Sequence, residues 1–154
     1  MEQLEREVLM ARYREGYSAV REAVASLVEA ELDTRRGAGW TPREIVHHLA
    51  DSEMTAAIRL RRLLAEERPG IAGYDEELFA RKLHYGERPI AASLEAVRTA
   101  RETSVELLGC LSEEEWAREG THSESGRYTV EDWLKIYAAH PHDHAAQIVA
   151  AFQR

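Results

Sequence analysis

Two histidines lie on the apolar face of the helix predicted at the C-terminus. That face is a stripe with steps of three and four residues, formed by Trp133, Tyr137, His140, His144, Ile148 and Phe152. Such steps keep the side chains on one side of a helix, which should face the core. Two histidines at a spacing of four lie side by side and can bind one metal ion. His142 falls about 200° around the helix from His140 and should point away.

A third histidine lies on the core-facing stripe of an earlier predicted helix. His48 shares that stripe with Ile45, Leu49, Ser52 and Ala56, and His47 is rotated about 100° from it. His48, His140 and His144 are therefore the candidate ligands of one divalent metal ion, because three imidazoles suit Zn²⁺, Ni²⁺ or Fe²⁺. Three protein ligands leave coordination positions open for water or substrate, as catalysis requires.

The alternative is that these three histidines are core side chains held by hydrogen bonds. The remaining histidines, His47, His84, His122 and His142, are interpreted as solvent-facing or loop residues. Pro141 bears on the metal hypothesis, because a proline inside a helix costs about 3 kcal/mol and kinks it. If the helix restarted at Pro141, the spacing of four between His140 and His144 would no longer place them together.

Four long segments with helical periodicity must position these histidines. We expect helices over 4–32, over 41–67, over 90–111, and from residue 128 to the C-terminus. Thr41, Pro42 and Glu44 form a capping box with proline at the first helical position. Ser112 and Glu115 predict a second capping box that starts one or two helical turns.

The segments between the long helices are expected to be short helices and loops. Residues 75–83 favour a short helix inside a long connection, and residues 120–127 are polar and loop-like. No segment shows the alternation typical of a sheet. The pattern predicts an all-α protein, a four-helix bundle, and the long connection between the second and third helices permits a crossover.

Length and charge limit the class of protein. The chain has 154 residues, the size of one domain, and we expect a single helical-bundle domain over 1–154. A formal net charge of −8 argues against nucleic-acid binding and against docking on anionic lipid. We expect a cytoplasmic protein, because no signal peptide or membrane span is visible. The one cysteine, Cys110, is interpreted as a small buried apolar residue.

Two motifs resemble those of a known family. The segment Trp40-Thr41-Pro42-Arg43-Glu44-Ile45-Val46-His47-His48-Leu49-Ala50-Asp51-Ser52 is similar to the second-helix motif of the DinB/YfiT-like proposed metalloenzymes. The segment His140-Pro141-His142-Asp143-His144-Ala145-Ala146-Gln147-Ile148 resembles their C-terminal motif of two histidines four apart. Tyr74-Asp75-Glu76 resembles the YfiT branch in particular, and the resemblance covers about 39–154.

The resemblance implies a fold, a metal and a partner. The implied fold is a four-helix bundle of up-down-down-up topology, often a homodimer. The implied cofactor is one divalent ion, nickel or zinc first and iron or manganese as alternatives, held at the positions of His48, His140 and His144. The residue between the paired histidines varies in the family, so Pro141 is a tolerable departure from its pattern.

The resemblance also implies a choice of chemistry on a small-molecule substrate. Members of the family are described as metal-dependent hydrolases, and relatives transfer a low-molecular-weight thiol to an electrophile or use one to isomerise maleylpyruvate. We favour the thiol transferase and keep the hydrolase as the alternative. Two further hypotheses stay open: a non-catalytic bundle, which predicts a fourth protein ligand, and a helical interaction module, which predicts no metal.

Four polar residues near the predicted ligands are further candidates. Ser52 could line the cavity, and Asp51, Asp143 and Gln147 could hold imidazole N–H groups. For all four, a surface or core-polar role is the favoured interpretation.

Overall fold

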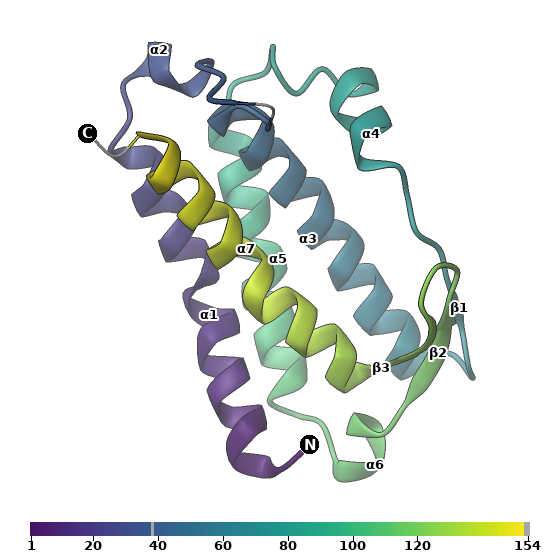
Figure 1. The fold of residues 1–154 in the computed structure, drawn as a ribbon. Coiled ribbons are helices and arrows are strands. Elements are labelled where there is room, and N and C mark those ends of the chain that lie inside the picture. Colours follow the sequence, from purple (N-terminus) through teal and green to yellow (C-terminus); the bar gives the residue numbers. More distant parts are fainter. Residues whose placement is uncertain (38, 153–154) are drawn as a thin grey trace.

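The computed structural model describes residues 1–37 and 39–152. Four long helices form the bundle in Figure 1: α1 (Gln3–Ala25), α3 (Pro42–Ala65), α5 (Ala91–Leu108) and α7 (Val130–Phe152). Helices α1 and α7 run in one direction and α3 and α5 in the other, so the order is up-down-down-up (Figure 1). Helix α7 packs against α1 and α3, and α5 completes the ring between them. The predicted four-helix bundle is confirmed.

The predicted caps begin two of the helices. The Thr41 hydroxyl accepts the backbone N–H of Glu44 at 3.2 Å, and the Glu44 carboxylate accepts the N–H of Thr41 at 2.8 Å. Ser112 and Glu115 form the same reciprocal pair before α6 (Glu113–Trp116). These bonds satisfy backbone N–H groups that a helix start leaves without partners, which fixes where each helix begins.

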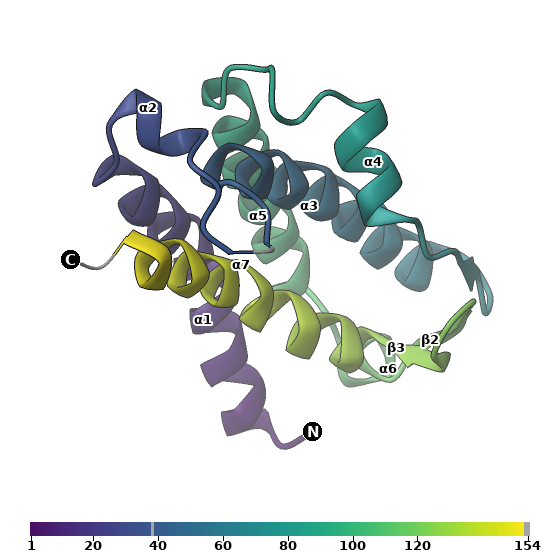
Figure 2. The ribbon, with the colours of Figure 1, turned by 45° about the horizontal axis from the view of Figure 1, so that its top comes forward.

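Several predicted helix ends lie too far along the chain. The first helix ends at Ala25, where the Ser26 hydroxyl donates to the carbonyl of Ala23, and a separate turn, α2 (Glu29–Leu32), follows. Helices α3 and α5 each stop two or three residues before the predicted end. Helix α4 (Glu76–Lys82) lies within the predicted short helix and runs along α3 on the side away from α1 (Figures 1 and 2).

The structure contains a small sheet that was not predicted. The prediction of a loop over 120–127 is therefore wrong. Strand β1 (Gly70–Ile71) pairs in parallel with β2 (Glu119–His122), which pairs in antiparallel with β3 (Gly126–Thr129). Strands of two and four residues are too short for alternation to be recognised. Gly126, with φ at +77°, supplies the left-handed residue that the hairpin turn requires.

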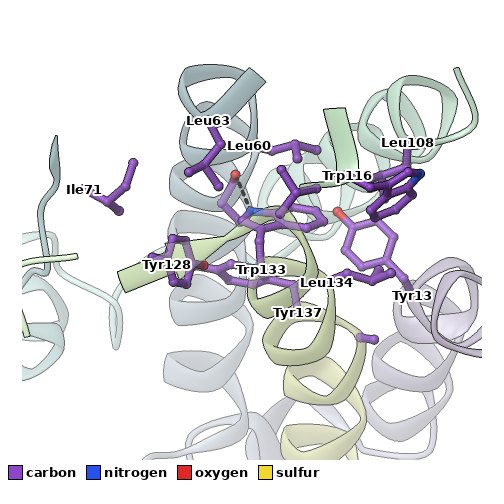
Figure 3. Close-up of a cluster of buried hydrophobic side chains, with 13 residues drawn as sticks. Tyr13, Leu60, Leu63, Ile71, Leu108, Trp116, Tyr128, Trp133, Leu134 and Tyr137 are labelled. Atoms are coloured by element: carbon purple, nitrogen blue, oxygen red, sulfur yellow. Dashed lines mark hydrogen bonds between the residues drawn. The ribbon is translucent and has the colours of Figure 1, made fainter. Parts of the chain in front are cut away.

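The core has two parts, one toward each end of the bundle. Figure 3 shows the first, where Trp133 packs among Tyr13, Leu60 and Tyr137 and its indole N–H donates to the carbonyl of Ala56 at 2.8 Å. The second part includes Val20, Ile45, Leu49, Val97 and Ile148. Along α7, His140 and His144 lie between the residues of the two clusters, and His48 lies among the residues that α3 contributes to the second cluster. None of the helices in the described chain is long and apolar enough to span a membrane.

Candidate metal centre

The structure brings His48 of α3 together with His140 and His144 of α7. The Nε2 atom of His140 lies 3.1 Å from Nε2 of His48 and 3.2 Å from Nε2 of His144. The candidate ligand atoms of all three residues lie within 4.8 Å of one another. The stripe positions deduced from the sequence therefore converge on one point between the two helices.

Helix α7 continues through Pro141, so the spacing of four between its two histidines holds. Proline has no N–H for the carbonyl of Tyr137, and the Arg101 guanidinium donates to that oxygen instead, at 3.2 Å. The ring of Pro141 lies against Gly16 of α1, where an added Cβ would be 2.5 Å from the proline Cγ. A guanidinium from α5 and a glycine from α1 thus accommodate the proline.

All three imidazoles are neutral at physiological pH. Burial, then the neighbouring His140 and His144, lower the pKa of His48 to about 3. Burial and His144 lower the pKa of His140 to about 4. Burial also lowers the pKa of His144, although its hydrogen bond to Gln147 opposes this. Neutral nitrogens carry the lone pairs that a metal ion requires.

Two polar side chains contact the Nδ1 atoms of His144 and His140, on the side of each ring away from the cluster. His144 donates from Nδ1 to the Gln147 side-chain oxygen at 3.0 Å, which leaves its Nε2 lone pair directed at the cluster. The Ser52 hydroxyl lies 3.5 Å from Nδ1 of His140. Gln147, which is exposed, and Ser52, which is buried, therefore contact the cluster in addition to the surface or core-polar role favoured for them.

The other two polar candidates do not contact the cluster, as that interpretation predicts. Asp51 accepts the hydroxyl of Tyr85, and Asp143 is exposed. The ring of Trp40, which was not predicted to take part, packs against His48 with a centroid distance of 4.6 Å.

Four histidines lie outside the cluster, and two of them differ from expectation. His47 is buried rather than solvent-facing, and its ring bonds the Ser93 hydroxyl at 2.7 Å and the Arg88 carbonyl at 3.0 Å. His122 lies in β2 rather than in a loop. His142 points away as predicted, with Nε2 2.9 Å from the Arg12 carbonyl, and His84 is exposed.

Cys110 was expected to be buried, and the structure shows that this is wrong. It is exposed just beyond the last residue of α5, and its thiol donates to the carbonyl of Glu106. An apolar neighbourhood in the sequence indicated burial, but the helix has already ended at that point.

The cluster fits a divalent metal ion with an open coordination position. A tetrahedral site with Zn–N bonds of about 2.0–2.1 Å separates its ligand nitrogens by about 3.3 Å. The two Nε2 separations of 3.1 and 3.2 Å are close to that edge length. Among the described residues, no cysteine, aspartate or glutamate joins the three histidines as a fourth ligand.

A cavity of about 240 Å³ adjoins the cluster at His140. Ser52, Arg59 and Tyr137 line it from the helices, and Tyr74 and Glu124 line it from the connections. Ser52 lines the cavity as the sequence allowed, but the wall formed by the small sheet and by the loop that leads into α4 was not predicted. Tyr74 carried a signal in the sequence, as part of the branch-specific Tyr74-Asp75-Glu76 motif.

A buried ion pair joins the four helices beneath the cluster. Arg101 of α5 and Glu53 of α3 are both almost fully buried and are in contact. Arg101 also donates to the carbonyl of Tyr13 in α1 and of Tyr137 in α7. Glu53 and Arg101 were not singled out from the sequence, because each is an ordinary charged residue until the four helices assemble.

Comparison with known proteins identifies the class to which this bundle belongs. Residues 12–148 match the DinB superfamily, and the chain belongs to that superfamily. A relative from Oceanobacillus iheyensis is 38% identical over 136 residues, covering 88% of this chain and 78% of that one. YfiT from Bacillus subtilis is 33% identical over 137 residues, covering 88% and 77%. Both carry the name of a proposed metal-dependent hydrolase.

Solved structures show the same fold. YfiT from Bacillus subtilis, described as having an unusual four-helix bundle topology, aligns with a TM-score of 0.92 at 29% identity. The alignment covers 98% of this chain and 87% of that one. A mycothiol-dependent maleylpyruvate isomerase aligns with a TM-score of 0.74 at 16% identity, covering 96% of this chain and 63% of that one. At that identity the likeness concerns the fold alone.

Proposed function

We propose that this protein is a metal-dependent enzyme that acts on a small molecule. One divalent ion would be held by the Nε2 atoms of His48, His140 and His144. The convergence of three neutral imidazole nitrogens, within 4.8 Å of one another, carries the proposal. The names of the relatives from Oceanobacillus iheyensis and Bacillus subtilis support metal-dependent chemistry. Imidazole ligands suit zinc, nickel and iron, and the family resemblance favours nickel or zinc, with iron or manganese as alternatives.

The residues of the chain have separable tasks in this proposal. Gln147 fixes the tautomer of His144, and Ser52 contacts the outer nitrogen of His140. The three ligand histidines cannot serve as general bases, because their Nε2 lone pairs would be occupied. The metal, when bound, supplies Lewis acidity that lowers the pKa of a thiol or water or polarises an acyl oxygen. The cavity beside His140 provides room for the organic substrate.

Transfer of a low-molecular-weight thiol to an electrophile is the reaction that we favour. The only cysteine of the chain, Cys110, lies at the end of α5 and does not line the cavity, so the nucleophile must come from solution. With an alkyl halide, a carbon–sulfur bond would form, the carbon–halogen bond would break, and the thiol proton would pass to solvent. Hydrolysis, with water in place of the thiol, is the second candidate, and the relatives' names favour it.

The test is turnover by metal-loaded protein. Bacterial thiols should react with a chromogenic electrophile faster in the presence of the metal-loaded protein than in the presence of the free metal ion. His48→Ala should reduce this rate to background. His142→Ala is the matched control, because His142 faces α1, and should keep the rate. Turnover of esters or amides without any thiol effect would replace transfer by hydrolysis. No turnover of either class, with a fourth protein ligand on the bound metal, would establish the non-catalytic bundle.

A further inference from the structure

The loop before α4 places a buried hydroxyl in the cavity beside His140. The hydroxyl of Tyr74 is shielded from solvent and forms no hydrogen bond to any described residue. Burial raises the pKa of Tyr74 to about 12, and the nearby Ser52 hydroxyl opposes that shift without meeting hydrogen-bond geometry. A buried hydroxyl without a partner is costly, so the free donor is explained by a ligand in the cavity.

Arg59 supplies a fixed positive charge to the same cavity. Its guanidinium donates to the Tyr137 hydroxyl at 2.9 Å and to the Ala72 carbonyl at 2.5 Å, and it lies 5.9 Å from the Tyr74 ring centroid. These two bonds hold the group in place and leave other N–H donors uncommitted. Within the described chain Arg59 forms no ion pair, so no protein carboxylate neutralises it at contact distance.

Two carboxylates line the exposed part of the cavity. The Glu124 carboxylate lies against the loop at Gly73, where an added Cβ would be 2.5 Å from Glu124 Oε1. The pKa of Glu76 is raised, first by desolvation and then by repulsion from Glu124, while Arg59 opposes the shift. In the described residues neither carboxylate is ion-paired. The cavity therefore combines a fixed cation, a free hydroxyl and a pair of unneutralised carboxylates.

We propose that this cavity binds a small amino-acid-like zwitterion. Its carboxylate would accept hydrogen bonds from Arg59 and the Tyr74 hydroxyl, and its ammonium would lie between Glu76 and Glu124. The assignment of this ligand as the substrate rests on the proposed function, because His140 belongs both to the cavity wall and to the metal centre. The binding itself needs no metal, since all four recognition groups lie outside the histidine cluster.

Three probes that share one propyl chain separate the two charges. Norvaline carries both groups, pentanoate lacks the ammonium, and butylamine lacks the carboxylate. Titration into chelator-treated, metal-free protein, followed by ligand-observed NMR, excludes chelation of the metal by the amino acid. We expect norvaline to bind at least about tenfold more tightly than either single-charge probe, since a hydrogen bond to a charged group contributes that much.

Variants should change the affinity for the probes selectively. Tyr74→Phe should weaken the binding of norvaline and of pentanoate and leave the affinity for butylamine unchanged. Glu76→Gln should reduce the preference for norvaline over pentanoate, because Glu124 alone then faces the ammonium. Arg61→Met is the control, because Arg61 lies on α3 but bonds Ala57 and Thr103 outside the cavity. A purely structural effect would weaken the binding of all three probes equally.

Failure of this inference is distinct from failure of the proposed function. Equal affinity for the three probes, or no norvaline binding at millimolar concentration by folded protein, would overturn the zwitterion site. Either result leaves metal binding and turnover untouched. Conversely, selective probe binding by a protein that takes up no metal would overturn the proposed enzyme and keep the site.

Discussion

At the scale of single residues, the histidine cluster depends on imidazoles that stay neutral inside the fold. His48, His140 and His144 each have a pKa below the ordinary histidine value of 6.5, and burial is the main cause. The same desolvation that keeps them available to a metal ion also makes the metal-free fold sensitive to acid. Two experiments address the two consequences separately.

The first prediction is that metal-free protein loses stability as the pH falls below about 6.5. Unfolded histidine takes up a proton near that pH, and His48 in the fold does so only near pH 3. Between these values the unfolded state binds more protons, so acid favours unfolding. At about pH 5, the shifted pKa of His48 alone should lower the free energy of unfolding by about 2 kcal/mol.

Urea unfolding at several pH values measures this dependence. His48→Leu should make it shallower, whereas His84→Ala, an exposed loop histidine, should keep the wild-type slope. Identical slopes for wild type and His48→Leu would show that His48 titrates normally in the fold.

The second prediction concerns the residue that orients His144. Gln147→Leu removes the acceptor of the Nδ1 proton, and the loss of such an outer contact lowers metal affinity by about 10–100-fold. Asp143→Asn is the control, because the exposed Asp143 side chain forms no hydrogen bond in the described structure and acts on His144 only through its charge. Competition with a chromophoric chelator measures the affinity. Equal effects of the two substitutions would mean that the Gln147 contact has no role in binding.

The three histidines could be predicted from the sequence, whereas most of their surroundings could not. A helical stripe fixes which side of α3 and α7 faces inward, so spacing predicts that His48, His140 and His144 face the core, and the topology brings them together. Gln147 is on the exposed edge of α7 and looks like any surface glutamine. The roles of Tyr74 and Arg59 depend on how separate connections fold over the bundle.

At the scale of elements, α7 keeps its histidines together because other helices compensate for its proline. Arg101 of α5 donates to the carbonyl that Pro141 leaves without a partner, and it also neutralises the buried Glu53 of α3. Sequence periodicity predicted the long helices and their capping boxes, since both are local. The strands have only two and four residues, and β1 pairs with a strand far along the chain, so no local sequence pattern predicts them.

The third prediction tests this buried pair. Arg101→Met should lower the free energy of unfolding by about 3–5 kcal/mol, because Glu53 is left buried without a counter-charge. The double variant Glu53→Met/Arg101→Met should be more stable than Arg101→Met. The double variant should remain less stable than wild type, because the carbonyl of Tyr137 still lacks a donor. Urea unfolding of both variants gives the comparison, and a double variant less stable than the single one would contradict the assignment.

At the scale of the whole molecule, the up-down-down-up order places α3 beside α7 and so creates the site. The sequence allowed this topology through its long connection between the second and third helices, but only the family resemblance indicated it. Apolar side chains also remain exposed on α3, on α4 and at the residue that follows α4, among them Met54, Ile58, Leu78 and Leu83.

The fourth prediction is that the protein forms a two-fold homodimer. Burial of exposed apolar surface against a second copy would stabilise such an assembly, and two-fold dimers are the commonest symmetric oligomers. Light scattering at micromolar concentration should give twice the chain mass of 17.5 kDa. A mass of one chain under those conditions would refute the dimer without affecting the metal centre.

The metal content of purified protein is the most direct test of the account. Protein made without a histidine tag should carry close to one divalent ion per chain, as measured by inductively coupled plasma mass spectrometry. His144→Ala should lose that ion, because it removes one of three converging nitrogens. His142→Ala, changed two residues away on the face toward α1, should keep it. Equal loss from both variants, or wild-type protein that binds no divalent ion when one is supplied, would contradict the proposed metal centre.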